Sequence, residues 1–447
     1  MSQKAIFDTN HLVRTYFKLA LPVVFSMVVT LVYNLADTYF IAQTNDALLV
    51  AGVSLCAPLF TMLMAIGNIF GQGGSSLIAR LLGGGEKGSA RRVSAFCFYL
   101  SILTGVVIAV PVLLLRQPIL ALLGASDKTI AHAEAYYAVI VAGAPLLILS
   151  FIHTNLMRSE GMSTLSMVGT VSGSLLNIAL DPIFISVLGW GARGAALATV
   201  MGYVLTDVLC LIFVMKKSDA LSVDIRMARV TGPELGQILS VGTTAAITNI
   251  ATSVCVVFMN QFLLPYGDEK IAALGIVLKV SMVVQLILVG FSFGGVPLFG
   301  YLFGAGERGR LKKLLRFCTA FLCALALAES VAVFLLAGPL MGVFIDNAAI
   351  ISDGAVMLRW QIAGMVCCAV VLLYTCLFQA CGKALQALAL SLSRQGVIFV
   401  LVFVVATRLA GYEGFLVAQP AADLISAALA LVLFHGAFGR AKLKERA

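Results

Sequence analysis

The sequence predicts an all-α integral membrane protein, with twelve transmembrane helices in two pseudo-symmetric six-helix bundles. Of its 447 residues, 61% are hydrophobic and only 11% are charged, whereas a soluble domain carries about 25% charged residues. Soluble chains of this length also divide into domains joined by polar linkers, and no long polar linker is present. A third observation is an internal repeat at an offset of 221 residues.

A membrane-spanning helix needs about 20 mostly apolar residues, and twelve segments meet this requirement. The first follows a polar N-terminus without a small-residue cleavage site, so we expect it to remain in the protein as a helix rather than be removed as a signal peptide. The expected spans cover residues 14–42, 48–71, 93–115, 130–155, 163–187, 193–215, 237–264, 270–294, 311–337, 350–379, 384–407 and 414–436.

Lysine and arginine are unevenly distributed between the two ends of these spans. Twenty-two of the 30 lie on the side that holds both termini, six lie on the other side, and Lys279 and Arg394 lie inside spans. Because positively charged loops stay in the cytoplasm, we expect both termini to be cytoplasmic and the protein to lie in the inner (plasma) membrane. This placement also explains the net charge of +9 without a nucleic-acid partner.

The internal repeat brings two glycine-rich segments into register. Gly71–Gly88 falls on Ser292–Gly309 with eight of 18 positions identical, and both segments end in a charged GxGE[KR]G turn. Each repeat contains six spans, so both halves enter the membrane in the same direction, an arrangement typical of transporters with the substrate site between the halves. We expect an N-terminal lobe over residues 1–217, a cytoplasmic linker over 218–235 and a C-terminal lobe over 236–447.

The fifth span carries polar residues in a pattern that favours an ion or proton site. A carboxylate at membrane depth costs a few kcal/mol or more and usually marks a function. Asn177 and Asp181 are spaced i, i+4, so both lie on one helix face. Pro182 has no N–H group, and it removes the hydrogen bond to the carbonyl group of Ile178. Two side chains and one freed carbonyl group then offer oxygen atoms in one small region.

Three residues on other spans are expected at a similar depth. Asp37, Thr199 and Tyr136 each lie about five or six residues from the outer end of their span, and a helix rises about 1.5 Å per residue. The acids are not duplicated in the second half. At the repeat offset, Asp37, Asn177 and Asp181 fall on Phe258, Ile398 and Val402. An asymmetric carboxylate pair indicates a coupling-ion site, and hydrogen bonding between helices is the structural alternative.

Other polar residues within the spans are candidates for contact with a substrate, or have no assigned role. The substrate candidates are Tyr33, Asn34, Lys279, Gln285, Asn260 and Gln361. Glu329, Arg394, Asp207 and Asp423 each stand alone on their helices, and ion pairing explains them as well as transport does.

Cysteine, histidine and glycine motifs argue against an enzyme or a nucleotide-driven motor. The ten cysteines form no CxxC pair, and the four histidines form no HExxH motif. The glycine-rich turns lack the GxxxxGK[ST] pattern of a nucleotide-binding loop. We therefore expect no cofactor, and an ion gradient as the energy source.

Three features together resemble the multidrug and toxic compound extrusion (MATE) family of secondary transporters. They are ADTYFIA around Asp37 followed by LLVAGVSLCAPL, the repeated GGxxLxxxLxGxGExG segment, and NIALDPIFI followed by GARGAALATV. The resemblance covers nearly the whole chain. It implies two six-helix lobes that open alternately to each side of the membrane. It also implies a monomer that exports small amphipathic, often cationic, molecules in exchange for H⁺ or Na⁺.

The pattern is most similar to the subgroup with its ion site in the N-terminal lobe, which includes DinF-like members. That likeness implies H⁺ or Na⁺ coupling at Asp37, Asn177, Asp181 and Thr199, with Tyr136 nearby, although Tyr137 leaves the tyrosine register open. Two alternatives remain: a lipid-linked oligosaccharide flippase, which would need a large basic cavity, and a narrow-specificity metabolite exporter. A membrane enzyme would need a cluster of catalytic residues, which the sequence does not contain.

Overall fold

The computed structural model describes Phe7 and residues 10–439, and these contain helices but no strand, which confirms the all-α class. Lys4 and the basic residues from Arg440 onward lie outside the described residues. The elements are α2 (Leu12–Ala42), α3 (Ala47–Leu55), α4 (Ala57–Gly83), α5 (Lys87–Leu114), α6 (Arg116–Leu122), α7 (Ile130–Ala142), α8 (Ala144–Ser159), α9 (Ser163–Asp181), the π-helix η1 (Pro182–Val187), α10 (Gly191–Lys217), the 3₁₀-helix η2 (Ile225–Met227), α11 (Gly232–Leu263), the 3₁₀-helix η3 (Leu264–Tyr266), α12 (Asp268–Gly304), α13 (Arg308–Gly342), α14 (Ala348–Ala363), α15 (Met365–Ala380), α16 (Ala384–Arg394) and α17 (Val397–Gly439).

Several helices begin at polar residues that satisfy the free N–H groups of the first turn. Asp46 accepts hydrogen bonds from the N–H groups of Leu48 and Leu49 and caps α3. Thr231 and Glu234 form a capping box at the start of α11, inside the stretch that the sequence predicts as linker. These caps mark where the chain leaves a loop and enters an apolar helix.

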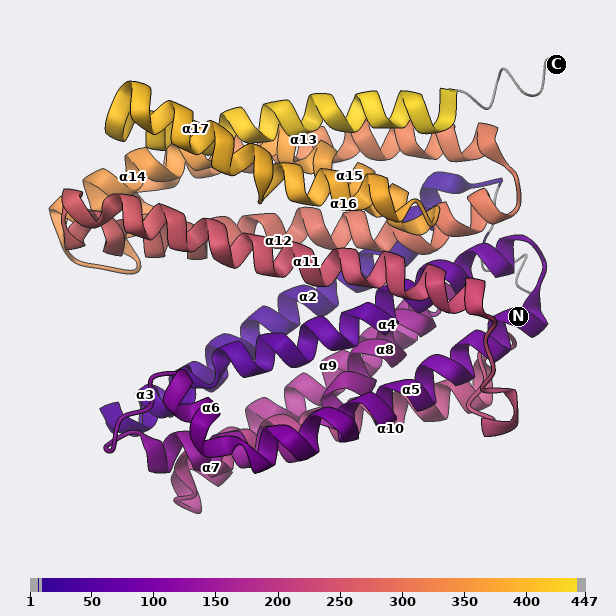
Figure 1. Ribbon diagram of the computed structural model, residues 1–447, viewed down its shortest axis with the longest axis horizontal. Helices are drawn as coiled ribbons and strands as arrows, with labels where there is room; N and C mark the ends of the chain where they lie inside the picture. The colour runs from indigo at the N-terminus through magenta and orange to yellow at the C-terminus, as the bar shows by residue number, and fades with distance from the viewer. Residues whose placement is uncertain (1–6, 8–9, 440–447) are drawn as a thin grey trace.

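Eight segments of the described residues are long and apolar enough to cross a membrane, and two helix pairs, bent by 53° and 46°, raise the number to ten. The expected seventh span falls in α11. The expected eleventh and twelfth fall in one segment, Ala384–Phe438. Gly411 lies between these two with non-helical dihedral angles, φ 54° and ψ −125°, at a kink within α17. Figure 1 shows that α17 doubles back along its length. The count of twelve stays a prediction.

The repeat offset recurs in the bounds of the helices. α4 ends at Gly83 and α12 at Gly304, while α5 begins at Lys87 and α13 at Arg308. α8 covers residues 144–159 and α15 covers residues 365–380. Every one of these pairs differs by 221, so the offset seen in the glycine-rich segments holds along both halves of the fold.

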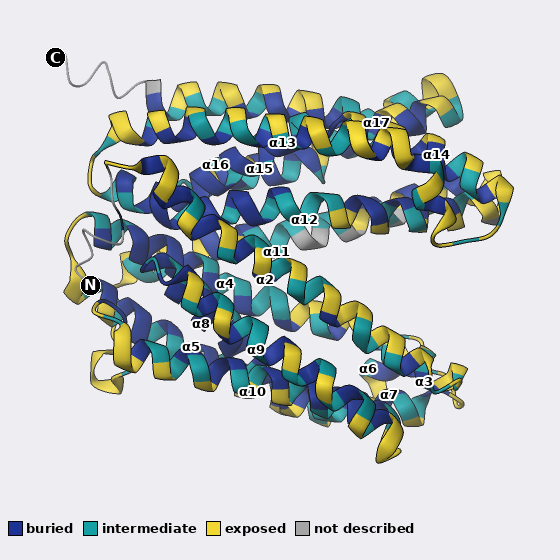
Figure 2. Ribbon diagram, turned by 180° about the vertical axis from the view of Figure 1, so that it is seen from behind, coloured by how far each residue is buried: buried dark blue, intermediate teal, exposed yellow. Residues whose placement is uncertain are grey.

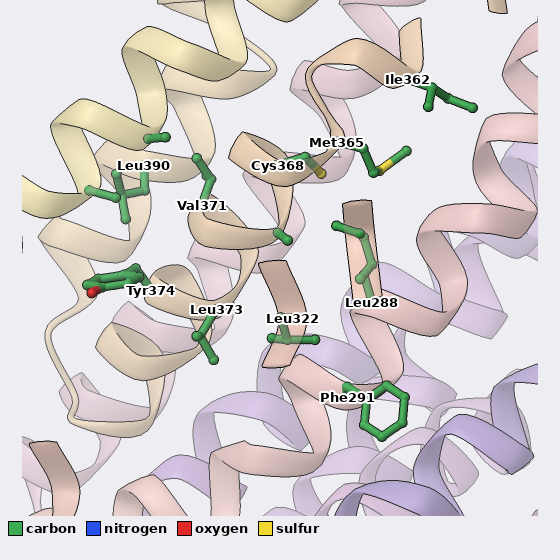
Figure 3. Close-up of a cluster of buried hydrophobic side chains, with 14 of the residues drawn as sticks. Leu288, Phe291, Leu322, Ile362, Met365, Cys368, Val371, Leu373, Tyr374 and Leu390 are labelled. Carbon is green, nitrogen blue, oxygen red and sulfur yellow. The ribbon is translucent and has the colours of Figure 1, made fainter. Parts of the chain in front are cut away.

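Helices α2–α10 and α11–α17 form two groups with separate hydrophobic cores. The groups diverge toward the end of the molecule that holds α3, α7 and α14, and they approach each other at the opposite end (Figure 1). One core lies mainly among α3–α10 and the other mainly among α12–α17. Leu288, Leu322 and Leu373 belong to the second core (Figure 3). The boundaries of the two lobes and their linker stay predictions.

The first helix of each half crosses to the other half. α2 packs on α12, and α11 packs on α4. Tyr16 of α2 is fully buried in the second core, and its hydroxyl group donates a hydrogen bond to the carbonyl oxygen of Phe291, at 3.0 Å. Ile238 of α11 is fully buried in the first core. This exchange joins the two halves along the centre of the molecule.

A symmetric glycine contact joins α4 and α12 where the halves approach. A Cβ atom added to Gly83 would lie 2.0 Å from the carbonyl oxygen of Tyr301, and one added to Gly304 would lie 2.0 Å from that of Arg80. Gly83 and Gly304 are related by the repeat offset, as are Arg80 and Tyr301. The repeated glycine motif therefore brings two helix backbones into direct contact and closes this end.

Large apolar side chains cover the outer surfaces of the bundle. Leu114 on α5 is 79% exposed and Leu409 on α17 is 82% exposed. Exposed residues run along the outward-facing sides of α13, α17 and α10 (Figure 2). A surface this apolar is unfavourable in water and favourable in lipid, which agrees with a protein that spans the membrane.

Candidate functional site

A cavity of about 510 Å³ lies between the two helix groups. Its lining comes from both halves: α2, α4, α8, α9 and α10 on one side, and α11, α12, α15 and α16 on the other. The lining also contains amide side chains that the sequence did not single out, those of Asn68, Gln72, Asn155, Gln379 and Gln395. Asn68 and Gln72 are four residues apart within an apolar helix, a signal similar to the one that singled out Asn177 and Asp181.

Two glycines bring α9 and α10 close enough for the polar residues of the N-terminal half to meet. A Cβ atom on Gly173 would lie 2.4 Å from the carbonyl oxygen of Gly202. One turn farther along α9, the amide nitrogen Nδ2 of Asn177 lies 3.5 Å from Oγ1 of Thr199 on α10 and donates to it. Asn177 and Thr199 are both buried and both line the cavity.

Asp181 is fully buried at the point where the fifth span changes its helical form. α9 ends at Asp181, and the π-helix η1 begins at Pro182. π-Helical turns are rare and often occur at functional sites. The sequence predicts an irregularity at Pro182 through the missing N–H group, and the structure has its change of helix type at this residue.

Asp37 reaches the same region from α2. It interacts electrostatically with Asp181 and with Tyr136, which is buried on α7. Tyr137 points elsewhere, because its hydroxyl group donates to the carbonyl oxygen of Val112 on α5, at 2.7 Å. Of the two tyrosines, Tyr136 is therefore the one that interacts with Asp37, and its part in ion coupling stays a prediction.

The oxygen atoms of this cluster lack partners within the protein. Among the described residues, Oδ1 of Asp37, Oδ1 of Asn177 and both carboxylate oxygens of Asp181 are buried without a hydrogen bond. Two neighbouring carboxyl groups that each hold buried oxygens cannot both be ionised without compensation, and unsatisfied buried oxygens are costly. The arrangement suits a shared proton or a cation with oxygen ligands.

The substrate candidates divide between the cavity and other places. Tyr33 and Asn34 line the cavity, and the Tyr33 hydroxyl group lies 3.4 Å from that of Tyr203. Lys279 is exposed, and it lies outside the cavity lining together with Gln285, Asn260 and Gln361.

The unassigned charges inside the spans mostly have partners. Nε of Arg394 lies 2.9 Å from Oδ1 of Asp423, and both residues are buried. Oδ1 of Asp207 accepts a hydrogen bond from the Ser150 hydroxyl group, at 2.8 Å. Glu329 differs, because its two carboxylate oxygens are buried without a hydrogen bond among the described residues.

Comparison with known proteins identifies the family. The MatE family model matches the chain twice, over residues 22–183 and 244–404. The chain belongs to the MatE family. MatE proteins are membrane transporters and not enzymes, and the two matches lie about one repeat offset apart. The DinF-like subgroup remains a prediction, because the matches do not separate subgroups.

Two kinds of relative support this membership. The chain is 29% identical over 429 residues to the "Multidrug export protein MepA" of Staphylococcus saprophyticus, covering 96% of this chain and 95% of the relative. A solved structure titled "Outward-facing conformation of a multidrug resistance MATE family transporter of the MOP superfamily" is similar with a TM-score of 0.87, 26% identity and coverage of 96% and 95%. A second, "Crystal structure of MATE in the bent conformation", has a TM-score of 0.93, 24% identity and full coverage of both chains, and shows the shared fold.

Proposed function

We propose that this MatE protein exports small amphipathic, often cationic, compounds by alternating access, in exchange for H⁺ or Na⁺. The observation that carries the proposal is the pair of interacting carboxyl groups, Asp37 and Asp181, with buried oxygens that lack partners beside a cavity between the halves. The name of the staphylococcal relative, "Multidrug export protein MepA", supports the same activity.

The coupling step uses residues that connect the ion site with the cavity wall. Asp37 lies one turn beyond Tyr33 and Asn34 on α2, and both of these line the cavity. Entry of an ion from outside neutralises the carboxyl pair, and α2 then bends into the cavity and expels the substrate. Pro22 lies inside α2 and removes one backbone hydrogen bond, which makes bending of this helix less costly.

The direction of opening follows from the glycine contact. The halves touch through Gly83 and Gly304 at the end that carries the basic GxGE[KR]G turns. With those turns in the cytoplasm, as the positive-inside rule requires, the cavity is closed toward the cytoplasm. Substrate is then released to the outside, and the protein reopens inward by separating this glycine contact.

Export in exchange for an ion is tested in liposomes that contain the purified protein. Ethidium transport is driven by a proton gradient and, separately, by a sodium gradient, for the native protein and for Asp37→Asn and Asp181→Asn. We expect one gradient to drive transport in the native protein, and both variants to fall to the rate of empty liposomes. The active gradient identifies the ion.

Asp127→Asn is the matched control, because Asp127 lies exposed in the loop between α6 and α7 and the substitution is chemically the same. Normal gradient-driven transport by Asp37→Asn would contradict the coupling scheme. Absence of transport under both gradients by folded native protein would favour a flippase or a narrow-specificity exporter. The cavity gives a flippase little support, since among the described residues its lining contains two basic side chains, those of Arg158 and Arg394.

A further inference from the structure

The C-terminal wall of the cavity departs from the repeat at one place. Arg394 and Asp423 occupy the positions that Gly173 and Gly202 hold in the N-terminal half. The two glycines permit a direct contact of helix backbones, whereas their counterparts form a buried ion pair at 2.9 Å. The register is secure, because α9 begins at residue 163 and α16 at residue 384, again 221 residues apart.

The helix that carries Arg394 is interrupted where its counterpart is continuous. α16 ends at Arg394 and α17 begins at Val397, while α9 continues through Gly173 to Asp181. Gln395, inside the break, lines the cavity and accepts a hydrogen bond from the Thr252 hydroxyl group, at 2.6 Å. Interrupted helices at membrane depth often form substrate sites in transporters.

The guanidinium group of Arg394 uses one of its nitrogens in the ion pair with Asp423, and its two terminal nitrogens remain available as hydrogen-bond donors. Its side chain is 8% exposed and lines the cavity. Nε donates to Oδ1 of Asp423, which also accepts a hydrogen bond from Gln419 at 3.1 Å. Among the described residues, no acceptor is found for the two terminal guanidinium nitrogens of Arg394. These nitrogens keep accessible surface in a side chain that lines the cavity, so they can donate to water or to an acceptor group that enters the cavity.

We propose that Arg394 binds a carboxylate group of the transported compound through its two terminal guanidinium nitrogens. The planar guanidinium fork matches a carboxylate in geometry and charge. Asp423 is a positioning residue, since it fixes the orientation of the fork through Nε. The inference rests on the proposed export function, because it assigns substrate recognition in the same cavity to one residue.

A pair of dyes that differ in one group tests this site. The probes are a rhodamine with a free carboxyl group and the methyl ester of the same dye, and binding to purified protein in detergent is measured by fluorescence anisotropy. Charge-assisted hydrogen bonds predict that the native protein binds the acid about tenfold more tightly than the ester. The same ratio is then measured in variants.

The single change Arg394→Gln leaves Asp423 buried without its partner, and the variant is expected to fold poorly. The double variant Arg394→Gln/Asp423→Asn removes both charges, and the asparagine at position 423 keeps the size of the aspartate. We expect it to bind the acid and the ester with equal affinity. Arg394→Lys retains the positive charge but lacks the planar guanidinium group, so it should lower the acid-to-ester affinity ratio severalfold.

The proposal is overturned if the native protein binds the acid and the ester with equal affinity, or if the double variant keeps the native acid-to-ester affinity ratio. A further contrary result is that Arg158→Gln loses the acid-to-ester affinity ratio while the double variant keeps it. That result would assign carboxylate binding to Arg158, the other cavity arginine, and would also overturn the proposal. Binding is measured without a gradient. A native protein that binds the acid more tightly than the ester but exports neither dye would therefore contradict the export function. It would not contradict the binding of a carboxylate by Arg394.

Discussion

Adding one methyl group to the α4–α12 contact should shift the protein away from the closed arrangement. Gly304→Ala places its Cβ atom 2.0 Å from the carbonyl oxygen of Arg80, and real Cβ atoms almost never come within 3.0 Å of another heavy atom. The obstructing atom belongs to a helix backbone and cannot rotate away. Gly83→Ala has the same effect from the opposite helix, against the carbonyl oxygen of Tyr301.

The size of the effect follows from the displacement required. The two helices must separate by about 1 Å at this crossing, and overpacking of this kind costs about 1–3 kcal/mol. Only the arrangement in which the halves touch carries the cost. Its population relative to an open arrangement should therefore fall by about 5–150-fold.

Distances between spin labels measure the populations directly. Labels at Lys87 and Lys313 lie near the starts of α5 and α13, close to the contact, and both side chains are exposed. The chain contains ten cysteines, so the labels are attached through non-canonical amino acids. We expect a longer distance to gain population in Gly304→Ala and in Gly83→Ala.

Gly88→Ala and Gly309→Ala are matched controls. These glycines also belong to the repeat, yet an added Cβ atom would meet nothing within 4 Å at either position. Their distance distributions should equal that of the native protein. Unchanged distributions in Gly83→Ala and Gly304→Ala, with normal thermal stability, would refute the assignment of this contact as the closure.

Three further predictions concern stability, each measured by thermal unfolding in detergent. Arg394→Gln should lower the free energy of unfolding by about 3–5 kcal/mol because Asp423 becomes a buried unpaired charge, and adding Asp423→Asn should recover most of the loss. Gly411→Ala should cost about 1–3 kcal/mol because a side chain is strained at φ 54°, whereas Gly436→Ala, in open space, should not. Glu160, in the loop after α8, accepts hydrogen bonds from the N–H groups of Asp219 and Ala220, so Glu160→Ala should cost about 1–3 kcal/mol. Burial raises the pKa of Glu160 above its usual value. Its titration thus favours the folded state below the ordinary glutamate pKa of about 4.3, and this contribution is lost as the pH rises through the raised folded pKa. Glu160→Gln should remove that pH dependence, and an unchanged pH profile would contradict this explanation.

The helices and the ion-site candidates could be predicted because their signals are local. Apolar runs long enough for a membrane and a carboxylate within such a run are visible in the chain itself. The i, i+4 spacing of Asn177 and Asp181 fixes their common face without knowledge of neighbouring helices. Lys279 was also visible as an intramembrane charge, yet it lies exposed outside the cavity lining, because hydropathy says nothing about which side of a helix faces the centre.

The sequence by itself determined the membrane class and the duplication, and it singled out Asp37 and Asp181 as candidates, since these inferences depend on composition, offset and helical period. The tertiary structure alone decided that Tyr136 and not Tyr137 accompanies Asp37, and that Arg394 pairs with Asp423 from another helix. It also decided that Gly83 and Gly304 meet. The physical reason is that these relations join segments far apart in the chain, and their geometry depends on the rotation and crossing of whole helices.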